Sequence, residues 1–312
     1  MFKKKTKSYL ITGGTGFIGR NITESLIRQG FRVTIFDNNF RGSIKKLRSK
    51  KKINFIKGDV RNRKKFFKCL NNIDAVIHLA YVNGTKYFYS KPNLVLDVAV
   101  KGLLNVLDGC VKYKIKELYL ASSSEVYQTP LKIPTTENEM LKVPDVYNPR
   151  YSYGVGKILT EVMGINLGRK LFKKLIIFRP HNVYGLNMGT EHVIPEFLAR
   201  FKNLKGKKFK IQGTGNEIRS FIFIDDFVKA FELIIKKGKH LNIYNIGTTE
   251  KITMKKLALT ISKILNKKII LKKSPLKKGG TTIRVPDIKK IKKLGFKPRY
   301  SLKAGIRKIL EN

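Results

Sequence analysis

The sequence predicts an α/β fold with a doubly wound parallel sheet, helices on both faces and a smaller C-terminal part. Two observations predict it. Short apolar runs alternate with segments of helical period from Ser8 to Phe178, and a glycine-rich turn directly follows the first apolar run. The chain has 312 residues, of which 42% are hydrophobic, enough to fill the core of one large domain with a smaller companion.

The elements follow one another in β–α order. We expect strands over 8–12, 31–36, 53–56, 75–79, 117–121 and 175–178, and helices over 17–29, 63–71, 94–112 and 153–170. Prolines break the pattern in 129–150, which predicts a loop over the end of the sheet. Beyond Arg179 the alternation weakens. We therefore expect residues 1–185, with 220–247 returning to them, to form the main domain, and 186–219 with 248–312 to form a smaller substrate-binding domain.

The net charge of +45 admits a nucleic acid or membrane partner, steering of an anionic substrate, or a general use of lysine on solvated faces. The basic residues are spread over the whole chain, and no basic stretch alternates with aromatic residues. We expect solvated faces, and neither nucleic acid nor membrane binding. Cys69 and Cys110 have no disulfide or metal spacing, and no apolar run approaches the roughly 18 residues of a membrane span. These features predict a soluble, cytoplasmic protein without a metal.

The turn after the first predicted strand carries Gly13, Gly16 and Gly19, followed by an amphipathic helix that begins at Phe17-Ile18. The first glycine permits the tight turn, the second lets backbone approach a pyrophosphate, and the third lets the helix pack against the strand. Free N–H groups at the helix N-terminus favour the anion. This arrangement predicts a Rossmann-type dinucleotide site.

Asp37 ends the second predicted strand, 18 residues after Gly19. A carboxylate there accepts hydrogen bonds from the adenosine ribose hydroxyls and repels a 2′-phosphate, so it favours NAD over NADP. Arg41 nearby leaves NADP open.

Tyr153 and Lys157 are four residues apart in a helical segment, so their side chains share one face. A nearby ammonium favours the phenolate, lowers the tyrosine pKa and makes it a usable base. The run Ser122-Ser123-Ser124 ends the fifth predicted strand, and sites in such sheets lie at strand carboxyl ends.

With these motifs the sequence resembles the extended short-chain dehydrogenase/reductase family, in its nucleotide-sugar epimerase/dehydratase branch. The resemblance covers nearly the whole chain. It is carried by the glycine turn, Asp37, 58–60, 78–80, 122–127, Tyr153 with Lys157, 179–185, 219–226 and 244–247.

The resemblance implies a retained NAD, with Asp59 at the adenine and Val60, Leu79 and Ala80 beside the cofactor. It implies that Tyr153 takes the proton from the sugar O4 hydroxyl, while Lys157 holds the nicotinamide ribose. Ser123 would bond the reacting oxygen. Residues implied to contact the nucleotide-diphosphate-sugar substrate are Ser124, Asn182, Arg219 and Arg284. It also implies a homodimer formed by the helices 94–112 and 153–170, and a role in polysaccharide biosynthesis.

Glu125 bears on the reaction class. By resemblance, 4,6-dehydratases and decarboxylases carry glutamate here, whereas many 4-epimerases carry a small residue. A glutamate could abstract the C5 proton in 4,6-elimination, so we slightly favour a 4,6-dehydratase over a 4-epimerase or a decarboxylase. A structural Glu125 and a non-catalytic Rossmann protein that binds RNA or an anionic membrane remain as alternatives. His181 resembles a residue of GDP-mannose 3,5-epimerases, but we expect it to be structural.

Overall fold

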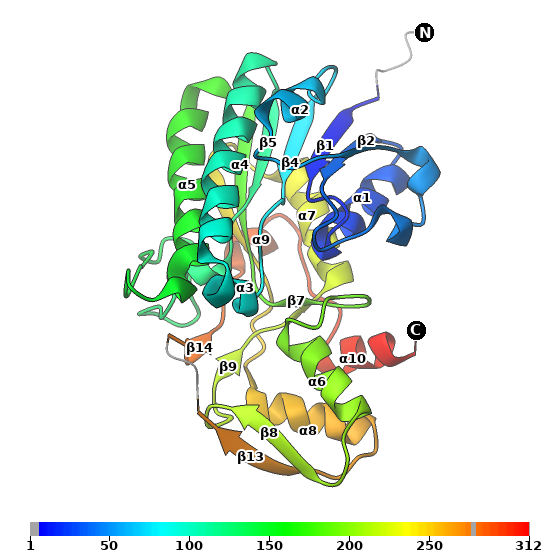
Figure 1. Ribbon diagram of the computed structural model, residues 1–312, viewed down its shortest axis with the longest axis vertical. Helices are drawn as coiled ribbons and strands as arrows, with labels where there is room; N and C mark the ends of the chain where they lie inside the picture. The colour runs from blue at the N-terminus through cyan, green and yellow to red at the C-terminus, as the bar shows by residue number, and fades with distance from the viewer. Residues whose placement is uncertain (1–5, 276–278, 312) are drawn as a thin grey trace.

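The protein is described by a computed structural model that covers residues 6–275 and 279–311. Its centre is a seven-stranded, all-parallel sheet with the strand order β11-β6-β5-β4-β1-β2-β3 (Figure 1). The strands are β1 (Ser8–Thr12), β2 (Arg32–Asp37), β3 (Ile53–Lys57), β4 (Ala75–His78), β5 (Glu117–Ala121), β6 (Lys174–Pro180) and β11 (Asn242–Ile246). This confirms the predicted doubly wound parallel sheet.

The order of the strands turns back at β1, which pairs with β2 on one side and β4 on the other. Ile11 lies opposite Ile35 in one pair and opposite Ile77 in the other. At such a switch point the connections leave toward opposite faces, which opens a crevice at the carboxyl ends of the strands. The glycine turn follows β1 directly and therefore lies in this crevice.

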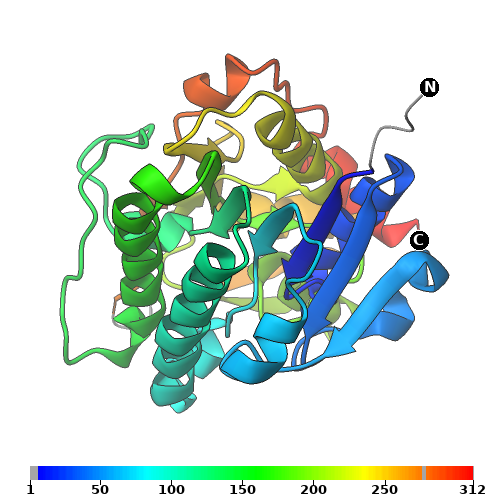
Figure 2. The same ribbon diagram turned by 90° about the horizontal axis from the view of Figure 1, so that it is seen from above.

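Helices cover both faces of the sheet (Figures 1 and 2). One face carries α4, α5 and α2, and the other carries α1 and α7, with α4 and α5 side by side. Alternate strand residues serve the two faces: Leu10 packs with the α4/α5 layer, and Tyr9 and Ile11 pack toward α1 and α7. The bounds are α1 (Phe17–Arg28), α2 (Arg63–Lys68), α3 (Thr85–Ser90), α4 (Pro92–Lys112), α5 (Ser152–Leu171) and α7 (Ile224–Lys237).

A smaller lobe lies below the carboxyl edge of the sheet (Figure 1). In it β8 pairs in parallel with β13, and β9 lies between β12 and β14. Its elements are α6 (Val193–Lys202), β8 (Lys208–Gln212), β9 (Ile218–Arg219), β12 (Ile252–Thr253), α8 (Met254–Ile264), β13 (Ile270–Ser274) and β14 (Ile283–Arg284). Phe197, Phe201 and Phe209 of this lobe belong to the same buried apolar cluster as Ile11 of β1, so the core continues between the two parts.

The remaining elements join the two parts. Strand β7 (Val183–Tyr184) pairs with β10 (Ile222–Phe223), α9 (Lys289–Lys292) contacts β11, and α10 (Leu302–Leu310) packs on α8 and β10. The chain thus returns to the main sheet at α9 before it ends on α8 and β10. The division into two domains remains a prediction.

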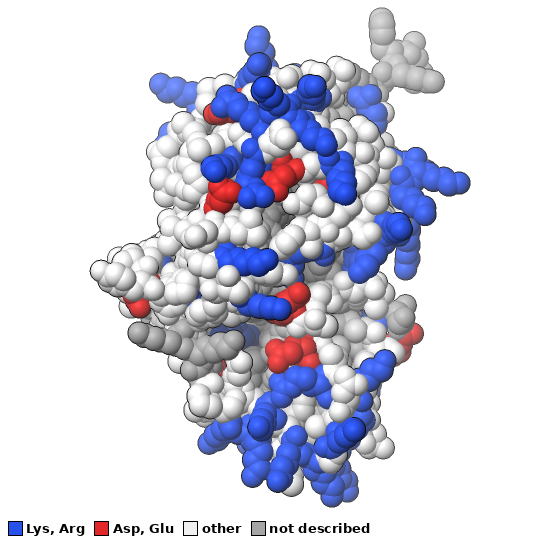
Figure 3. Space-filling model, viewed as in Figure 1, with Lys and Arg blue, Asp and Glu red and all other residues white. Residues whose placement is uncertain are grey.

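Several details differ from the sequence-based prediction. Helix α2 ends at Lys68, before the predicted end at 71, and α4 begins at Pro92, before the predicted start at 94. Helix α3 was not predicted; it is short and ends at Ser90, two residues before the proline that starts α4. Strand β6 extends to Pro180, beyond the predicted apolar run. Lysine and arginine side chains are spread over both lobes of the viewed face (Figure 3). Within residues 6–275 and 279–311, none of the helices combines the length and the apolarity that a membrane crossing needs.

Candidate active site

A pocket of about 1210 Å³ lies at the carboxyl edge of the sheet, between the main sheet and the smaller lobe. Its lining includes every residue predicted to contact cofactor, substrate or reacting atoms: Gly13, Gly16, Phe17, Ile18, Gly19, Asp37, Asp59, Val60, Leu79, Ala80, Ser123, Ser124, Glu125, Tyr153, Lys157, Asn182, Arg219 and Arg284. Residues from strand ends that are far apart in the sequence therefore meet in one cavity.

The glycine turn can pack as tightly as it does only because it lacks side chains. A Cβ at Gly13, where φ is +73°, would lie 2.7 Å from the Ala80 nitrogen, and one at Gly19 would lie 2.1 Å from the Gly13 oxygen. Gly16 precedes α1 as its N-cap and lines the pocket. The turn thus presents bare backbone at a helix N-terminus, which fits the pyrophosphate of NAD.

Asp37 is held at the end of β2 by two backbone groups. Its Oδ2 accepts from the Thr15 nitrogen at 3.0 Å, and its Oδ1 accepts from the Asn39 nitrogen at 2.7 Å. Arg41, the residue that left NADP open, forms an ion pair with Glu191 at 2.9 Å. The carboxylate is therefore fixed in the pocket while the nearby guanidinium is engaged elsewhere. This arrangement favours NAD.

We expect Asp37→Ala to lower the NAD over NADP preference at least about tenfold, or ~1.4 kcal/mol, because the ribose acceptor and the repulsion of a 2′-phosphate are both lost. Titration calorimetry with both dinucleotides measures the ratio. Asp59→Ala is the matched control and should weaken both cofactors alike. An unchanged ratio in Asp37→Ala would show that another group selects the cofactor.

The adenine end of the predicted site is tied down by internal bonds. Asp59 accepts from the Arg61 guanidinium at 2.9 and 3.0 Å and from the Asn38 amide at 3.2 Å, and the Arg61 hydrogen bonds hold its pKa below the ordinary value. Directly after strand β4, the backbone nitrogens of Leu79 and Ala80 donate to the hydroxyl of Thr12, the last residue of β1. These bonds orient both segments; their contacts with the cofactor remain predictions.

Tyr153 and Lys157 lie one turn apart at the start of α5, facing the end of β5. The Lys157 Nζ donates to the Ala121 oxygen at 2.7 Å and lies 5.7 Å from the centroid of the Tyr153 ring. Burial raises the pKa of Tyr153, and a hydrogen bond with Ser123 opposes that rise. Burial lowers the pKa of Lys157 to about 7, against the opposing charge of Glu161. The three predicted catalytic groups are thus brought together.

Glu125 lies in the short 3₁₀ helix Ser124–Tyr127, and its nitrogen donates to the Ser123 hydroxyl. Its carboxylate lies 2.7 Å from Arg284 and 3.8 Å from Arg150. Burial raises the pKa of Glu125, but the two guanidiniums outweigh it and bring the pKa to about 2. The carboxylate is therefore ionised and paired.

Arg150 was not predicted from the sequence. It comes three residues before Tyr153, in the loop that the prolines indicated, and lines the pocket with only 11% of its side chain exposed. The signal that could have found it is a basic residue at the end of a loop that leads into the catalytic helix.

Arg219 and Arg284 are paired residues of the neighbouring strands β9 and β14. Arg219 donates to the oxygens of Ile218, Thr281 and Thr282. Burial, and then Arg284, lower the pKa of Arg219 to about 10. Arg284 is buried and Arg219 half-buried, and adjacent guanidiniums repel each other, so an anion between them is favoured, as expected for a diphosphate.

Two other predicted positions have internal partners. The Asn182 amide donates to the Ser220 oxygen at 2.8 Å, and its φ is +40°. His181 is fully buried, contacts Asn245 at 3.1 Å, and has its pKa lowered to about 3 by burial. This surrounding is consistent with the structural role expected of His181. The substrate contact of Asn182 remains a prediction.

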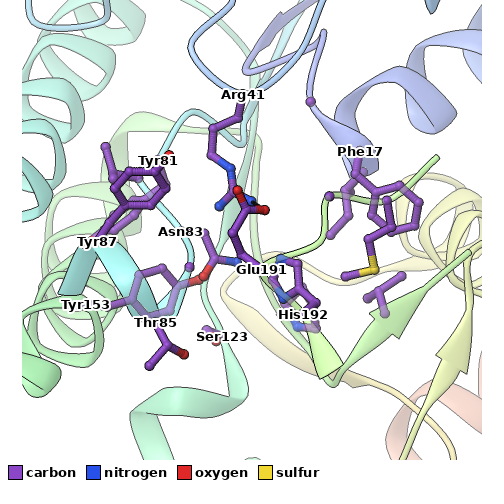
Figure 4. A pocket seen from close by; sticks show the side chains of 18 of the residues that line it. Phe17, Arg41, Tyr81, Asn83, Thr85, Tyr87, Ser123, Tyr153, Glu191 and His192 are labelled. Carbon is purple, nitrogen blue, oxygen red and sulfur yellow. Dashed lines mark hydrogen bonds and ion pairs between the residues drawn. The ribbon is translucent and has the colours of Figure 1, made fainter. Parts of the chain in front are cut away.

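Aromatic side chains that the motifs did not indicate surround Tyr153. Phe88 of α3 stacks on its ring with centroids 4.8 Å apart, and Tyr81 meets it edge-on at 5.0 Å. Figure 4 shows Tyr81 and Tyr87 beside Tyr153 on one side of the pocket, with Phe17 on the other. An apolar wall thus shields the phenol that would act as base.

The comparisons with known proteins agree with this geometry. The family model described as "NAD dependent epimerase/dehydratase family" matches residues 9–247. UDP-glucuronic acid decarboxylase 3 of Arabidopsis thaliana is 30% identical over 95% of this chain and 86% of its own. The dTDP-D-glucose 4,6-dehydratase of Dictyostelium discoideum is 30% identical over 78% of this chain and 59% of its own.

Among solved structures, the UDP-glucose 4-epimerase of Thermotoga maritima, determined with UDP-glucose, matches with a TM-score of 0.89 and 27% identity, covering 97% of each chain. The chain is therefore similar to proteins with three different activities. The chain belongs to the NAD-dependent epimerase/dehydratase family and is an NAD-dependent enzyme.

Proposed function

We propose that this enzyme oxidises C4 of a nucleotide-linked sugar and reduces the product again within one turnover. The observation that carries this proposal is the meeting of Ser123, Tyr153 and Lys157 beside the glycine turn in one pocket. Tyr153 would take the proton of the O4 hydroxyl, Ser123 would hold O4, and the Lys157 ammonium would stabilise the phenolate. NAD bound at the turn supplies the acceptor for the C4 hydride.

The surroundings of Glu125 bear on the step after C4 oxidation. A 4,6-elimination needs a base for the C5 proton and an acid for the departing O6 hydroxyl. Glu125 is the residue on which the sequence-based preference for a dehydratase depends. It is a weak base because two guanidiniums hold its pKa near 2. Its neighbour Ser124 is far too weak an acid to protonate a leaving hydroxide. The geometry therefore gives elimination less support than the sequence did.

Decarboxylation makes different demands. A uronic acid oxidised at C4 is a β-keto acid, so its C5–C6 bond breaks, carbon dioxide leaves, and the electron pair passes to the C4 carbonyl as an enolate. The enolate then takes a proton from water at C5, and hydride returns to C4. The step needs no base at C5, but it needs cations for the carboxylate. We assign this role to Arg150, which lines the pocket and lies 3.8 Å from its nearest carboxylate, Glu125, and we propose a nucleotide-linked uronic acid as the substrate.

The assay offers UDP-glucuronate, UDP-glucose and dTDP-glucose separately to the purified protein and identifies the products by NMR. Carbon dioxide and a nucleotide-linked pentose from the uronate are the expected result. A 4-keto-6-deoxy sugar from dTDP-glucose would establish the dehydratase instead, and a 4-epimer the epimerase. No change in any sugar would refute C4 oxidation.

We expect Arg150→Met to weaken binding of UDP-glucuronate at least about tenfold, since a hydrogen bond to a charged group contributes ~1.5–3 kcal/mol. Its affinity for UDP should stay unchanged, because the lost contact is to the sugar carboxylate. Arg219→Met is the matched comparison and should weaken both ligands, since we place Arg219 at the diphosphate. Titration calorimetry separates the two patterns. Equal losses for both ligands in Arg150→Met would place Arg150 at the diphosphate too.

We also propose a homodimer through α4 and α5. Among the described residues, these helices expose large apolar side chains at Val100, Leu104, Val111, Val155, Val162, Leu167 and Leu171. Adjacent apolar faces on two packed helices suit a symmetric interface.

Val162→Lys should shift the protein from dimer to monomer, because it places a charge within the apolar face. Light scattering coupled to gel filtration measures this against a monomer mass of 35.8 kDa. Leu259→Lys, at an apolar residue of similar exposure on α8, serves as the control and should leave the mass unchanged. A monomeric wild type would overturn the proposal.

The location of the enzyme in the cell and the pathway that it serves are two further proposals. Cys69 and Cys110 are buried free thiols, which suits a reducing compartment. We propose that the enzyme acts in the cytoplasm and supplies a sugar nucleotide for polysaccharide synthesis. Cell fractionation and the sugar composition of a deletion strain test the two statements.

A further inference from the structure

Tyr81 stands directly over the predicted catalytic lysine. It lies in the segment after β4, and its ring centroid is 3.8 Å from the Lys157 Nζ. The same ring meets Tyr153 edge-on at 5.0 Å, with an interplanar angle of 81° (Figure 4). Tyr81 therefore contacts both members of the tyrosine–lysine pair.

The fold makes room for this ring at one position of α5. A Cβ at Gly156 would lie 1.9 Å from the Tyr81 hydroxyl oxygen, so a residue with a side chain could not stand there without displacing Tyr81. The hydroxyl itself is buried and has no hydrogen-bond partner within the described part of the chain. A buried hydroxyl without a partner is unfavourable. Tyr81 therefore contacts the tyrosine–lysine pair through its ring and not through a hydrogen bond of its hydroxyl.

Lys157 needs such a neighbour because, among the residues that the structure describes, no carboxylate near it is free to pair with it. The titratable groups around it are Tyr81, Tyr153, His78 and Glu161. The Glu161 carboxylate already accepts hydrogen bonds from the Nε and Nη2 atoms of Arg179. His78 is neutral at ordinary pH because burial and the charge of Lys157 lower its pKa to about 3. Within the described part of the chain, the hydrogen bond to the Ala121 oxygen and the face of Tyr81 therefore hold Lys157.

We propose that Tyr81 is a positioning residue whose ring face keeps the Lys157 side chain charged and directed toward Tyr153. An ammonium over an aromatic face is attracted by the negative face of the ring, most strongly where water is excluded. The neutral amine gains no such attraction. Removing the ring therefore lowers the pH at which Lys157 loses its proton.

The charge of Lys157 sets the direction of the pH effect. Lys157 must be protonated to stabilise the phenolate of Tyr153, so activity falls on the alkaline side as Lys157 deprotonates. Burial already brings the Lys157 pKa to about 7. Without the ring, this alkaline limb moves to lower pH by about one unit, which is tenfold in proton affinity.

The experiment compares Tyr81→Phe, which keeps the ring, with Tyr81→Leu, which removes it. The first readout uses the NAD-loaded protein without substrate. The urea midpoint of Tyr81→Leu should fall below that of Tyr81→Phe at pH 6, and the gap should narrow above pH 8, where Lys157 is neutral in both and only the lost packing of the ring against Tyr153 remains. In a Lys157→Met background the gap should be the same at every pH. This readout does not depend on the proposed function.

The second readout is the pH profile of kcat on whichever sugar the enzyme turns over. Tyr81→Phe should keep the wild-type profile, and Tyr81→Leu should shift the alkaline limb. If Tyr81→Phe shifts as much as Tyr81→Leu, the hydroxyl is the working group and the proposal fails. It also fails if the stability gap is independent of pH. Should Tyr81→Leu not fold, Tyr81→Met fills the same space without a ring and enters the same comparison.

Discussion

Replacing Tyr153 by phenylalanine is expected to lower kcat by about 10²–10⁴-fold, the usual contribution of a positioned general base. The substitution removes one hydroxyl from a ring that is held between Phe88 and Tyr81. The ring contacts remain, so the fold and cofactor binding should persist. Turnover of the sugar identified by NMR, measured at saturating substrate, checks the loss.

Ser152→Ala is the matched control for this prediction. Ser152 neighbours Tyr153, and its hydroxyl is buried without a partner within the described residues. We expect its activity to stay within a few-fold of the wild type, because no described contact is lost. If Tyr153→Phe kept more than about a tenth of the wild-type kcat, Tyr153 would not be the base.

Breaking the ion pair between Arg179 and Glu161 is expected to destabilise the protein by about 3–5 kcal/mol, because removing one partner leaves an uncompensated buried charge. Their side chains are only 2% and 3% exposed, and the Arg179 Nε and Nη2 reach the two carboxylate oxygens at 2.8 and 2.5 Å. The Ser122 hydroxyl also donates to Glu161, and Arg179 donates to the Tyr127 hydroxyl. Urea unfolding of Arg179→Met measures the change.

The surface pair of Arg63 and Asp108 provides the comparison. These side chains are 60% and 45% exposed at a separation of 3.2 Å, so Arg63→Met should change stability by less than about 1 kcal/mol. The double variant Arg179→Met/Glu161→Leu should recover part of the loss, since no charge then remains buried. A loss in Arg179→Met no larger than that of Arg63→Met would mean that water reaches the buried pair.

The sequence alone determined the parts of this protein that depend on local spacing. The run Ser8–Thr12, the glycines after it and the helix from Phe17 could be predicted because buried parallel strands, tight turns and amphipathic helices each have their own short-range pattern. The pairing of Tyr153 with Lys157 could be predicted for the same reason, since residues four apart share a helix face.

Only the tertiary structure decided which charges and rings meet at the site. Glu125 and Arg284 are 159 residues apart in the chain, and Arg41 reaches Glu191 across 150. Tyr81 faces Lys157 because the segment after β4 passes α5 at Gly156, which leaves space for the ring. No periodicity encodes such contacts, because they depend on chain crossings and on the direction of each side chain. Burial then sets the pKa of Glu125 and of Lys157, and it too exists only once the chain has folded.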